Sequence, residues 1–419
     1  MFIYTVKTGD SLFSIVSRYQ VSMNEIRVVN GLTNTTLVPG QSLLIPTNAY
    51  IVQPGDSLYL ISQMSLIPVD TLRAANRLTS DVLLIGMRLV LPPRTKYPTE
   101  DLSFIVPTTP EQDLAIVGSF APINTYFGIF EYHILEGGNL STLNDTHLIE
   151  EARRNRVAPL ATITNLTPAG FSPEVLRQAL TSPEIRTKLI NNIYSLVTTK
   201  NYAGVNIDFE RVRAEERDLF SGFLRLLSER LRPAGYYISV AVPPKTSDEI
   251  PWLRGYDYAG IGSVVDFMFI MAYDWHETHS QPGPVAPIGE VRSTIEYALR
   301  QMPRNKIILG FARYGYDWTM DNGTAISGRA VSVAGAIQTA MRYQVPIQYS
   351  SLYQQAFFTY RDEDGKGHTV WFEDPRARAV KLQLVVDYRL RGVGAWQLGL
   401  QFPQSAILVE EFLAPKKVI

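Results

Sequence analysis

The chain has 419 residues, 46% of them hydrophobic, and a formal net charge of −1 at pH 7. This composition is ordinary for a globular protein whose core needs no disulfide support, and the near-neutral charge without a long Lys/Arg run argues against a nucleic-acid partner. The lack of cysteine excludes thiol catalysis, Cys-based zinc sites and disulfides, and no apolar stretch reaches the ~18 residues of a membrane span, so we expect no membrane partner.

The N-terminal segment contains an internal repeat. Residues 4–12 read YTVKTGDSL and residues 50–58 read YIVQPGDSL, an offset of 46 residues. The same offset relates residues 30–32 to 76–78, residues 39–41 to 85–87, and residues 45–46 to 91–92. A match that persists over this length predicts two copies of one structural unit.

Each copy is predicted to fold as a βααβ module. Tyr4 and Val6 alternate with polar residues as in a short strand, and residues 9–11 provide a turn and a helix N-cap. Apolar residues then follow at helical spacing, a second helix fits residues 23–29, and residues 43–45 form a closing strand. The second copy shows the same order of signals and closes at residues 89–91.

The two modules resemble the LysM family through the Gly-Asp-Ser-Leu opening, the central Asn and the closing Pro-Gly-Gln-Ser-Leu-Leu-Ile-Pro. The resemblance implies binding of glycans that contain N-acetylglucosamine, in a groove between the first strand–helix loop and the loop after the second helix. The opposing loops would be residues 33–37 and 79–83, and a scaffold module without a ligand is the alternative. The implied glycan-binding residues are Gly9, Asp10, Ser11, Leu12, Gly55, Asp56, Ser57 and Leu58.

The sequence divides into four segments. Residues 1–47 and 48–93 are the predicted LysM modules, residues 94–110 are a Pro-rich linker that we expect to be extended and fairly stiff, and residues 111–419 form the largest domain.

The largest domain alternates apolar runs with helical patterns and is assigned to the α/β class. Eight such runs favour a (β/α)8 TIM barrel over a doubly wound open sheet, and no G-x-G-x-x-G follows the first run. A small α+β insertion between strands 7 and 8, at about residues 320–375, would contain a hairpin around residues 362–367. The predicted strands are Ala115–Phe120, Tyr126–Tyr132, Leu160–Thr164, Gly204–Phe209, Tyr237–Val242, Phe267–Ala272, Ile307–Phe311 and Gly394–Leu398.

Three polar residues lie at the end of the predicted fourth strand. Asn206, Asp208 and Glu210 alternate with apolar residues, so the period of two places all three on one face. Carboxyl groups that point into a barrel at the C-terminal end of a strand are typical of catalysis, and two neighbouring acids push their pKa values apart. A structural polar cluster under a loop is the alternative.

This segment resembles the D-G-x-D-x-D-x-E signature of glycoside hydrolase family 18. Gly204, Asp208 and Glu210 match, whereas Ala203 and Asn206 stand where the family has Asp, which puts the pH profile in doubt. Residues 271–274 resemble the family's M-x-Y-D, and residues 311–315 and 394–396 extend the match to the ends of the seventh and eighth strands.

The resemblance implies a retaining, substrate-assisted mechanism that needs no cofactor and no metal. Glu210 would protonate the glycosidic oxygen and later activate water, Asp208 would hold the acetamido N–H, and the acetamido carbonyl would attack the anomeric carbon. Tyr273 would donate to the acetamido oxygen. The further residues implied in substrate binding are Asn206, Asp274, Tyr314 and Trp396, the last stacking on the sugar.

Two metal-like motifs are assigned to loops. Residues 276–279 read HETH, with one residue too few between Glu and the second His for the zincin pattern. Residues 362–365 lack the downstream Glu of a calcium loop and are expected to form a solvated hairpin tip.

Three functions are compatible with these signals. The first is endo-type cleavage of N-acetylglucosaminyl bonds in peptidoglycan, as in the cortex-lytic enzymes of spore formers, which the chain resembles in architecture. The second is a LysM-anchored chitinase, and the third is a non-catalytic lectin, which the retained Glu210 disfavours. For the first, we expect a monomer that binds peptidoglycan or a chitin-like polymer at the spore coat, cortex or cell wall, without a cleaved signal peptide, because residues 1–6 lack the charged and apolar regions of one.

Overall fold

The computed structural model describes all 419 residues and begins with two βααβ modules, as predicted. In each module the two strands pair antiparallel. The first module consists of β1 (Phe2–Thr5), α1 (Leu12–Tyr19), α2 (Met23–Asn30) and β2 (Ser42–Ile45). The second consists of β3 (Ala49–Ile51), α3 (Leu58–Ser65), α4 (Val69–Ala75) and β4 (Arg88–Val90).

The two modules pack against each other through one apolar core. Seventeen buried residues from both modules form a continuous cluster. The ring of Phe2 meets the ring of Tyr50 edge-on at 5.0 Å, and Tyr19 lies 5.5 Å from the same Tyr50 ring. The two repeats therefore form one rigid unit with a shared core, not two independent domains.

The largest domain is a closed barrel of eight parallel strands, which confirms the predicted fold class. The strands are hydrogen-bonded in the order β6-β21-β15-β14-β13-β12-β9-β7, and the pairing of β6 with β7 closes the ring. They are β6 (Leu102–Ile105), β7 (Tyr126–Leu135), β9 (Ala158–Thr164), β12 (Gly204–Asp208), β13 (Tyr237–Val242), β14 (Phe267–Ile270), β15 (Ile307–Ala312) and β21 (Gly392–Trp396).

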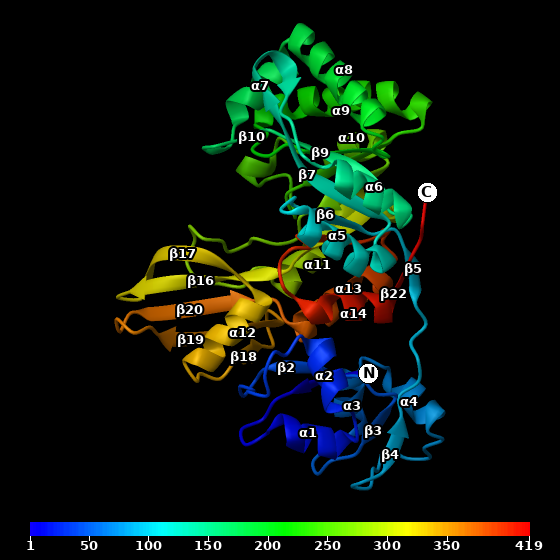
Figure 1. The fold of residues 1–419 in the computed structure, drawn as a ribbon, viewed down its shortest axis with the longest axis vertical. Helices are drawn as coiled ribbons and strands as arrows, with labels where there is room; N and C mark the ends of the chain where they lie inside the picture. Colours follow the sequence, from blue (N-terminus) through cyan, green and yellow to red (C-terminus); the bar gives the residue numbers. More distant parts are fainter.

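Helices surround this barrel and bury its outer face, as Figure 1 shows. Figure 1 also places the LysM modules at the end of the molecule opposite α7 and α8. No helix of the chain combines the length and the apolarity needed to cross a membrane. The helices are α5 (Pro110–Phe120), α6 (Thr146–Arg154), α7 (Pro173–Thr181), α8 (Pro183–Thr199), α9 (Arg217–Leu231), α10 (Tyr258–Val264), α11 (Ile288–Gln301), α13 (Pro375–Asp387) and α14 (Pro403–Phe412).

The first barrel strand is not the predicted one. Residues 115–120 belong to α5, whose N-cap Thr109 accepts a hydrogen bond from the N–H of Gln112 and whose first residue is Pro110. The first strand is β6, which lies inside the predicted linker and is only four residues long. The pattern failed there because a fully buried parallel strand shows no alternation, and because the prolines around it read as linker. The linker is also held to the barrel, since β5 (Tyr97–Thr99) pairs with β22 (Leu413–Pro415).

The insertion between β15 and β21 is a five-stranded antiparallel sheet with one helix. The predicted hairpin is confirmed, because β19 pairs with β20 across residues 362–366. Figure 1 shows this subdomain projecting to one side of the barrel. Its elements are β16 (Tyr314–Asp321), β17 (Thr324–Ser332), α12 (Val333–Arg342), β18 (Gln348–Ser350), β19 (Gln355–Arg361) and β20 (Gly367–Phe372).

The first LysM module is docked on the barrel and on this insertion. The hydroxyl of Ser42 donates to Asp374 at 3.0 Å, and the N–H of Ile347 donates to the carbonyl of Pro39 at 2.8 Å. Val38 is buried in the apolar core of the insertion, and Leu44 in the barrel core. The sequence predicted an extended linker between the modules and the largest domain, whereas the structure joins the first module to the barrel and its insertion by buried contacts.

This docking predicts different effects for two equivalent glycines. Gly40 and Gly86 have φ values of 84° and 83°. A Cβ on Gly40 would overlap the carbonyl oxygen of Ile347, whereas a Cβ on Gly86 meets nothing within 4 Å. We expect Gly40→Ala to lower the free energy of unfolding by about 1–3 kcal/mol more than Gly86→Ala, because only Gly40→Ala adds overpacking to the shared backbone strain. Urea unfolding of both variants measures the difference, and equal losses would contradict the docked arrangement.

Candidate active site

The end of β12 presents its polar residues to the inside of the barrel, as the alternation predicted. Asn206 and Asp208 are buried there, while Phe209 points outward and packs against Phe220 and Phe223 of α9, with ring centroids 5.9 and 5.5 Å away. The apolar residues of the strand thus anchor it to the helix layer. This anchoring fixes the strand so that the acids face the barrel axis.

Glu210 follows the strand and is held through its backbone. Its N–H donates to Oδ1 of Asn165 at 2.9 Å, and its carbonyl accepts from Nδ2 of the same residue at 2.9 Å. One amide side chain from the end of β9 therefore fixes both backbone groups of Glu210. The carboxylate of Glu210 is left free to face the cavity.

The two acids have raised pKa values. Burial, and secondly the charge of Asp274, raises the pKa of Glu210 to about 7. Burial, followed by the charges of Glu210 and Glu131, raises the pKa of Asp208 well above its ordinary value. The Oδ1 of Asp208 has no hydrogen-bond partner within the protein. The pair can therefore hold protons near neutral pH, as an acid catalyst requires.

Asn206 is anchored on one side only. Its Oδ1 accepts from the hydroxyl of Ser239 on β13 at 2.9 Å, while its buried Nδ2 has no partner. Ala203, the other departure from the family pattern, is a core residue. Neither departure adds a carboxylate to the cavity.

Tyr273 and Asp274 follow β14 and are positioned partly by the insertion. Asp274 has a left-handed backbone, with φ of 63°, and its Oδ1 accepts from the hydroxyls of Tyr314 at 2.8 Å and Tyr316 at 2.9 Å. Burial raises the pKa of Asp274 to about 6, although these two hydroxyls oppose the rise. Tyr273 lines the cavity, and its hydroxyl makes no hydrogen bond within the protein. The inserted subdomain thus orders the wall beside Glu210.

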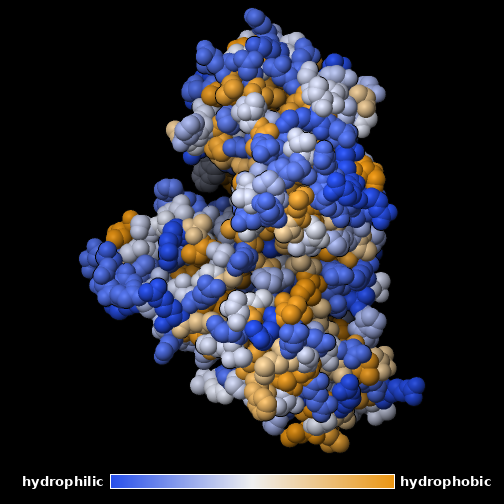
Figure 2. All heavy atoms as spheres, viewed as in Figure 1, coloured by the Kyte–Doolittle hydropathy of each residue, from blue (hydrophilic) through white to orange (hydrophobic).

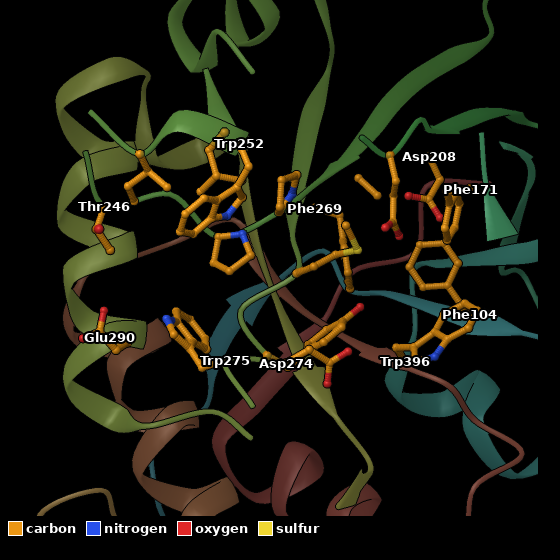
Figure 3. A pocket seen from close by; sticks show the side chains of 18 of the residues that line it. Phe104, Phe171, Asp208, Thr246, Trp252, Phe269, Asp274, Trp275, Glu290 and Trp396 are labelled. Carbon is orange, nitrogen blue, oxygen red and sulfur yellow. The ribbon is translucent and has the colours of Figure 1, made fainter. Parts of the chain in front are cut away.

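Aromatic side chains form much of the remaining wall. Trp396, at the end of β21, meets Phe130 edge-on with ring centroids 4.6 Å apart and lies 5.7 Å from Phe104. Figure 3 shows Asp208, Asp274 and Trp396 around one hollow, with Trp252 and Trp275 farther along it. The cavity has a volume of about 710 Å³, which suits an elongated sugar chain bound against ring faces.

The structure brings together all seven predicted residues of the barrel site. Asp208, Glu210, Tyr273, Asp274 and Trp396 line the cavity, Tyr314 donates to Asp274 from behind the wall, and Asn206 is buried two residues before Asp208 on β12.

Sequence reasoning missed several further residues of this region. Glu131, next to the cavity, accepts from the hydroxyl of Thr164 at 2.6 Å, and Phe130, Asn165 and Trp252 also surround the acids. Trp252 lies in the short 3-10 turn Pro251–Leu253, and binding residues often lie on such connecting segments. Phe130 and Glu131 lie in the predicted strand 126–132, and Asn165 directly follows the predicted strand 160–164, but the pattern does not show that their side chains reach the acids.

The predicted LysM glycan-binding residues largely build their own loops. The carboxylate of Asp10 accepts from the hydroxyl of Tyr4 at 2.5 Å and the N–H of Lys7 at 2.8 Å, and Asp56 repeats this arrangement. Ser11 and Ser57 cap α1 and α3, Leu12 and Leu58 are buried, and Gly9 and Gly55 have positive φ. The backbone groups of these loops and their exposed neighbouring side chains therefore remain available to bind a ligand.

The exposed neighbours include one aromatic residue in each module. Phe13 and Tyr59 occupy equivalent positions after the loops, and their exposed fractions are 71% and 63%. Figure 2 shows apolar atoms on the surface at the end of the molecule where the modules lie.

The two metal-like motifs remain loops. Glu277 accepts from the N–H of His279 at 3.0 Å, and the ring of His276 contacts the carbonyl of Gln281. No three His, Asp or Glu side chains of the chain are grouped as a metal ion would require. Asp362 accepts from the N–H groups of Asp364 and Lys366, as in a hairpin tip.

Family models match most of the chain. The model of glycosyl hydrolases family 18 matches residues 116–401, and the LysM domain model matches residues 4–46 and 50–92. The chain is 51% identical to a Bacillus subtilis (strain 168) protein that carries the provisional name sporulation-specific glycosylase YdhD, with 100% of both chains covered. It is 41% identical to the cortical fragment-lytic enzyme of the same organism, with 100% of this chain and 99% of the relative covered. Among solved structures, the Bacillus cereus spore cortex-lytic enzyme SleL superposes with a TM-score of 0.89, 35% identity and 99% coverage of both chains.

Proposed function

This chain belongs to glycosyl hydrolase family 18 and carries two LysM domains, and from that premise we propose that it cleaves N-acetylglucosaminyl bonds of peptidoglycan by endo-type attack. The observation that carries the proposal is the pair of buried acids, Asp208 and Glu210, at the end of β12 in a cavity walled by aromatic rings. The family 18 barrel supplies the catalytic acids, and the LysM domains supply the anchor to N-acetylglucosamine-containing glycan, within one chain.

The proposed reaction uses the substrate's own acetamido group. Glu210, protonated near neutral pH, gives its proton to the glycosidic oxygen, while the acetamido carbonyl attacks the anomeric carbon and displaces the leaving sugar. Asp208 accepts the acetamido N–H and stabilises the positive charge that develops there, and the free hydroxyl of Tyr273 donates to the acetamido oxygen. Water, activated by Glu210, then attacks the anomeric carbon and opens the oxazolinium ring that the acetamido group had formed. The configuration at the anomeric carbon is thereby retained.

Trp396 supports the sugar that reacts. Its indole lies in the barrel mouth between Phe130 and Phe104, where an apolar ring face can stack on a pyranose. Asp208, Glu210, Tyr273 and Trp396 line one cleft, and we propose that the protein acts on its substrate as a monomer.

Spore cortex is the proposed location of the substrate, with hydrolysis during germination. Relatives that match the whole chain, LysM modules included, are named for cortical fragments and spore cortex. A LysM-anchored chitinase is the competing assignment, because chitin presents the same N-acetylglucosamine unit.

Product analysis tests the proposal. We expect the protein to release fragments from spore cortex peptidoglycan that carry N-acetylglucosamine at the new reducing end, identified by mass spectrometry after borohydride reduction. Chitin oligomers, incubated in parallel, should turn over at a lower rate. A reducing-end muramic acid would contradict the bond assignment, and faster turnover of chitin oligomers than of cortex would favour the chitinase.

A further inference from the structure

A second hollow lies next to the catalytic cavity, on the other side of Glu210. The two hollows share Glu210, Pro243, Trp252 and Leu253 as a common wall. The second hollow has a volume of about 530 Å³ and opens to solvent beside Arg211. A polymer chain that places its reacting bond at Glu210 can therefore extend into it.

The shared wall and the rim carry two groups suited to a charged sugar. Trp252 has an exposed fraction of 75%, and a planar indole of this kind stacks on a pyranose ring. The guanidinium of Arg211 is exposed and makes no ion pair and no hydrogen bond with the protein. Apart from Glu210, the other charged side chains of the hollow are Arg213, which pairs with Glu174, and Glu215, which is exposed.

Arg211 occupies a tight turn of the backbone. Its φ is 58°, in the left-handed region where glycine or asparagine is less strained. The turn is fixed on both sides, because the hydroxyl of Tyr256 donates to the carbonyl of Phe209 at 3.0 Å and accepts from the N–H of Val212 at 3.5 Å. The rigid turn thus presents an exposed guanidinium that has no partner in the protein, which leaves it available to an anionic ligand.

We propose that Arg211 and Trp252 form a subsite for a carboxylate-bearing sugar of the polymer, such as a muramic acid unit with its lactyl or peptide carboxylate. Guanidinium and carboxylate pair through two parallel N–H···O bonds, and the preorganised turn reduces the entropy lost on binding. The subsite rests on the proposed function, since peptidoglycan carries such carboxylates and chitin carries none. It would make Arg211 a residue that selects peptidoglycan over chitin.

The test compares two substrates that differ only in the charge of the neighbouring muramic unit, and a third that carries a stem peptide. The substrates are an N-acetylglucosamine–muramic acid oligosaccharide with a free lactyl carboxylate, the same compound as its primary amide, and a form bearing a stem peptide. For the wild-type protein we expect kcat/KM to be about five- to tenfold higher for the carboxylate than for the amide. Arg211→Gln should reduce this ratio to about one, mainly through KM, whereas Arg225→Gln on α9, which removes an exposed charge elsewhere, should keep it.

The ratio separates this role from others. Loss of Arg211 also removes a charge that lowers the pKa of Glu210, but that effect acts on both substrates and cancels in the ratio. Arg211→Gly should fold well because glycine suits the φ of 58°, so a folding defect in the Gln variant cannot hide the result. Selectivity for the peptide-bearing form alone would assign the carboxylate to the stem peptide. A ratio that stays unchanged in Arg211→Gly overturns the subsite, whereas failure of the wild-type protein to cleave any of the three substrates would instead contradict the proposed function.

Discussion

Replacement of Glu210 by Gln should lower kcat on cortex peptidoglycan by at least about 10² to 10⁴ while leaving glycan binding intact. Gln is nearly isosteric and keeps the backbone clamp by Asn165, but it cannot donate the proton that the leaving oxygen needs. Turnover is measured by release of reducing ends, and binding by co-sedimentation with insoluble cortex. The matched control is Glu229→Gln, an exposed position on α9 far from the cavity. Activity of Glu210→Gln within a few-fold of the wild type would reject the assignment.

The pH profile provides an independent check on the same group. The pKa of Glu210 is raised to about 7, so the protonated form that acts as the acid predominates below that pH and is depleted above it. We therefore expect kcat/KM to fall about tenfold per pH unit above about 7. In Glu210→Gln this alkaline limb should vanish from whatever activity remains. If the variant kept the alkaline limb, that limb would report the titration of a group other than Glu210.

The Asp208→Asn variant should lose roughly 10²- to 10³-fold in turnover, by analogy with the removal of one preorganised group that stabilises transition-state charge. The amide still fits the site, yet it cannot stabilise the positive charge on the acetamido nitrogen as a carboxylate does. An oxazoline mimic such as a GlcNAc-thiazoline should inhibit the wild-type protein and bind Asp208→Asn less tightly, because it resembles the charged intermediate. Asp218→Asn, at an exposed position on α9, is the matched control.

Stereochemistry decides whether Asp208 has this role. Two inversions give retention, so proton NMR of a newly released reducing end should first show the β-anomer. Asn206→Asp should cause a smaller loss and shift the pH profile, because a further carboxylate would share protons with the pair at Asp208 and Glu210. First-formed α-anomer would mean a positioned water and an inverting reaction, and the substrate-assisted mechanism would have to be abandoned.

The catalytic strand could be predicted because its pattern is local. Alternation of polar and apolar residues over 204–210 fixes which side chains face the barrel, whatever the rest of the fold does. The contributions of Asn165 and Tyr316 could not be predicted, since each meets the site only after strands and helices far apart in the sequence have packed. The prediction missed strand β6 for a different reason, because four residues between prolines carry too little periodicity to distinguish a strand from a linker.

The docking of the first module is reflected in a sequence difference between the two copies of the repeat. At the C-terminal end of α2 the first copy has Gly31, and at the equivalent position the second copy has Arg77, both with positive φ. A Cβ on Gly31 would lie 2.5 Å from Cγ of Pro403 on α14, so only the copy that meets the barrel requires glycine. Differences between copies of a repeat thus indicate which copy is in contact with a neighbour, although the neighbour cannot be identified from them.

A module joined to the insertion by Val38 and Pro39, and to Asp374 by Ser42, cannot pivot, and this restricts which glycan strands of a wall benefit from it. A flexible anchor raises the local concentration of every glycan strand within its reach. A fixed anchor favours glycan strands that can occupy the LysM groove and the catalytic cleft at the same time. Fragments too short to span both sites gain nothing, so they bind with the affinity of the cleft alone. The rate advantage of the whole chain should therefore rise with glycan length and level off at the span between the two sites, which makes the enzyme responsive to the architecture of the wall as well as to its chemistry.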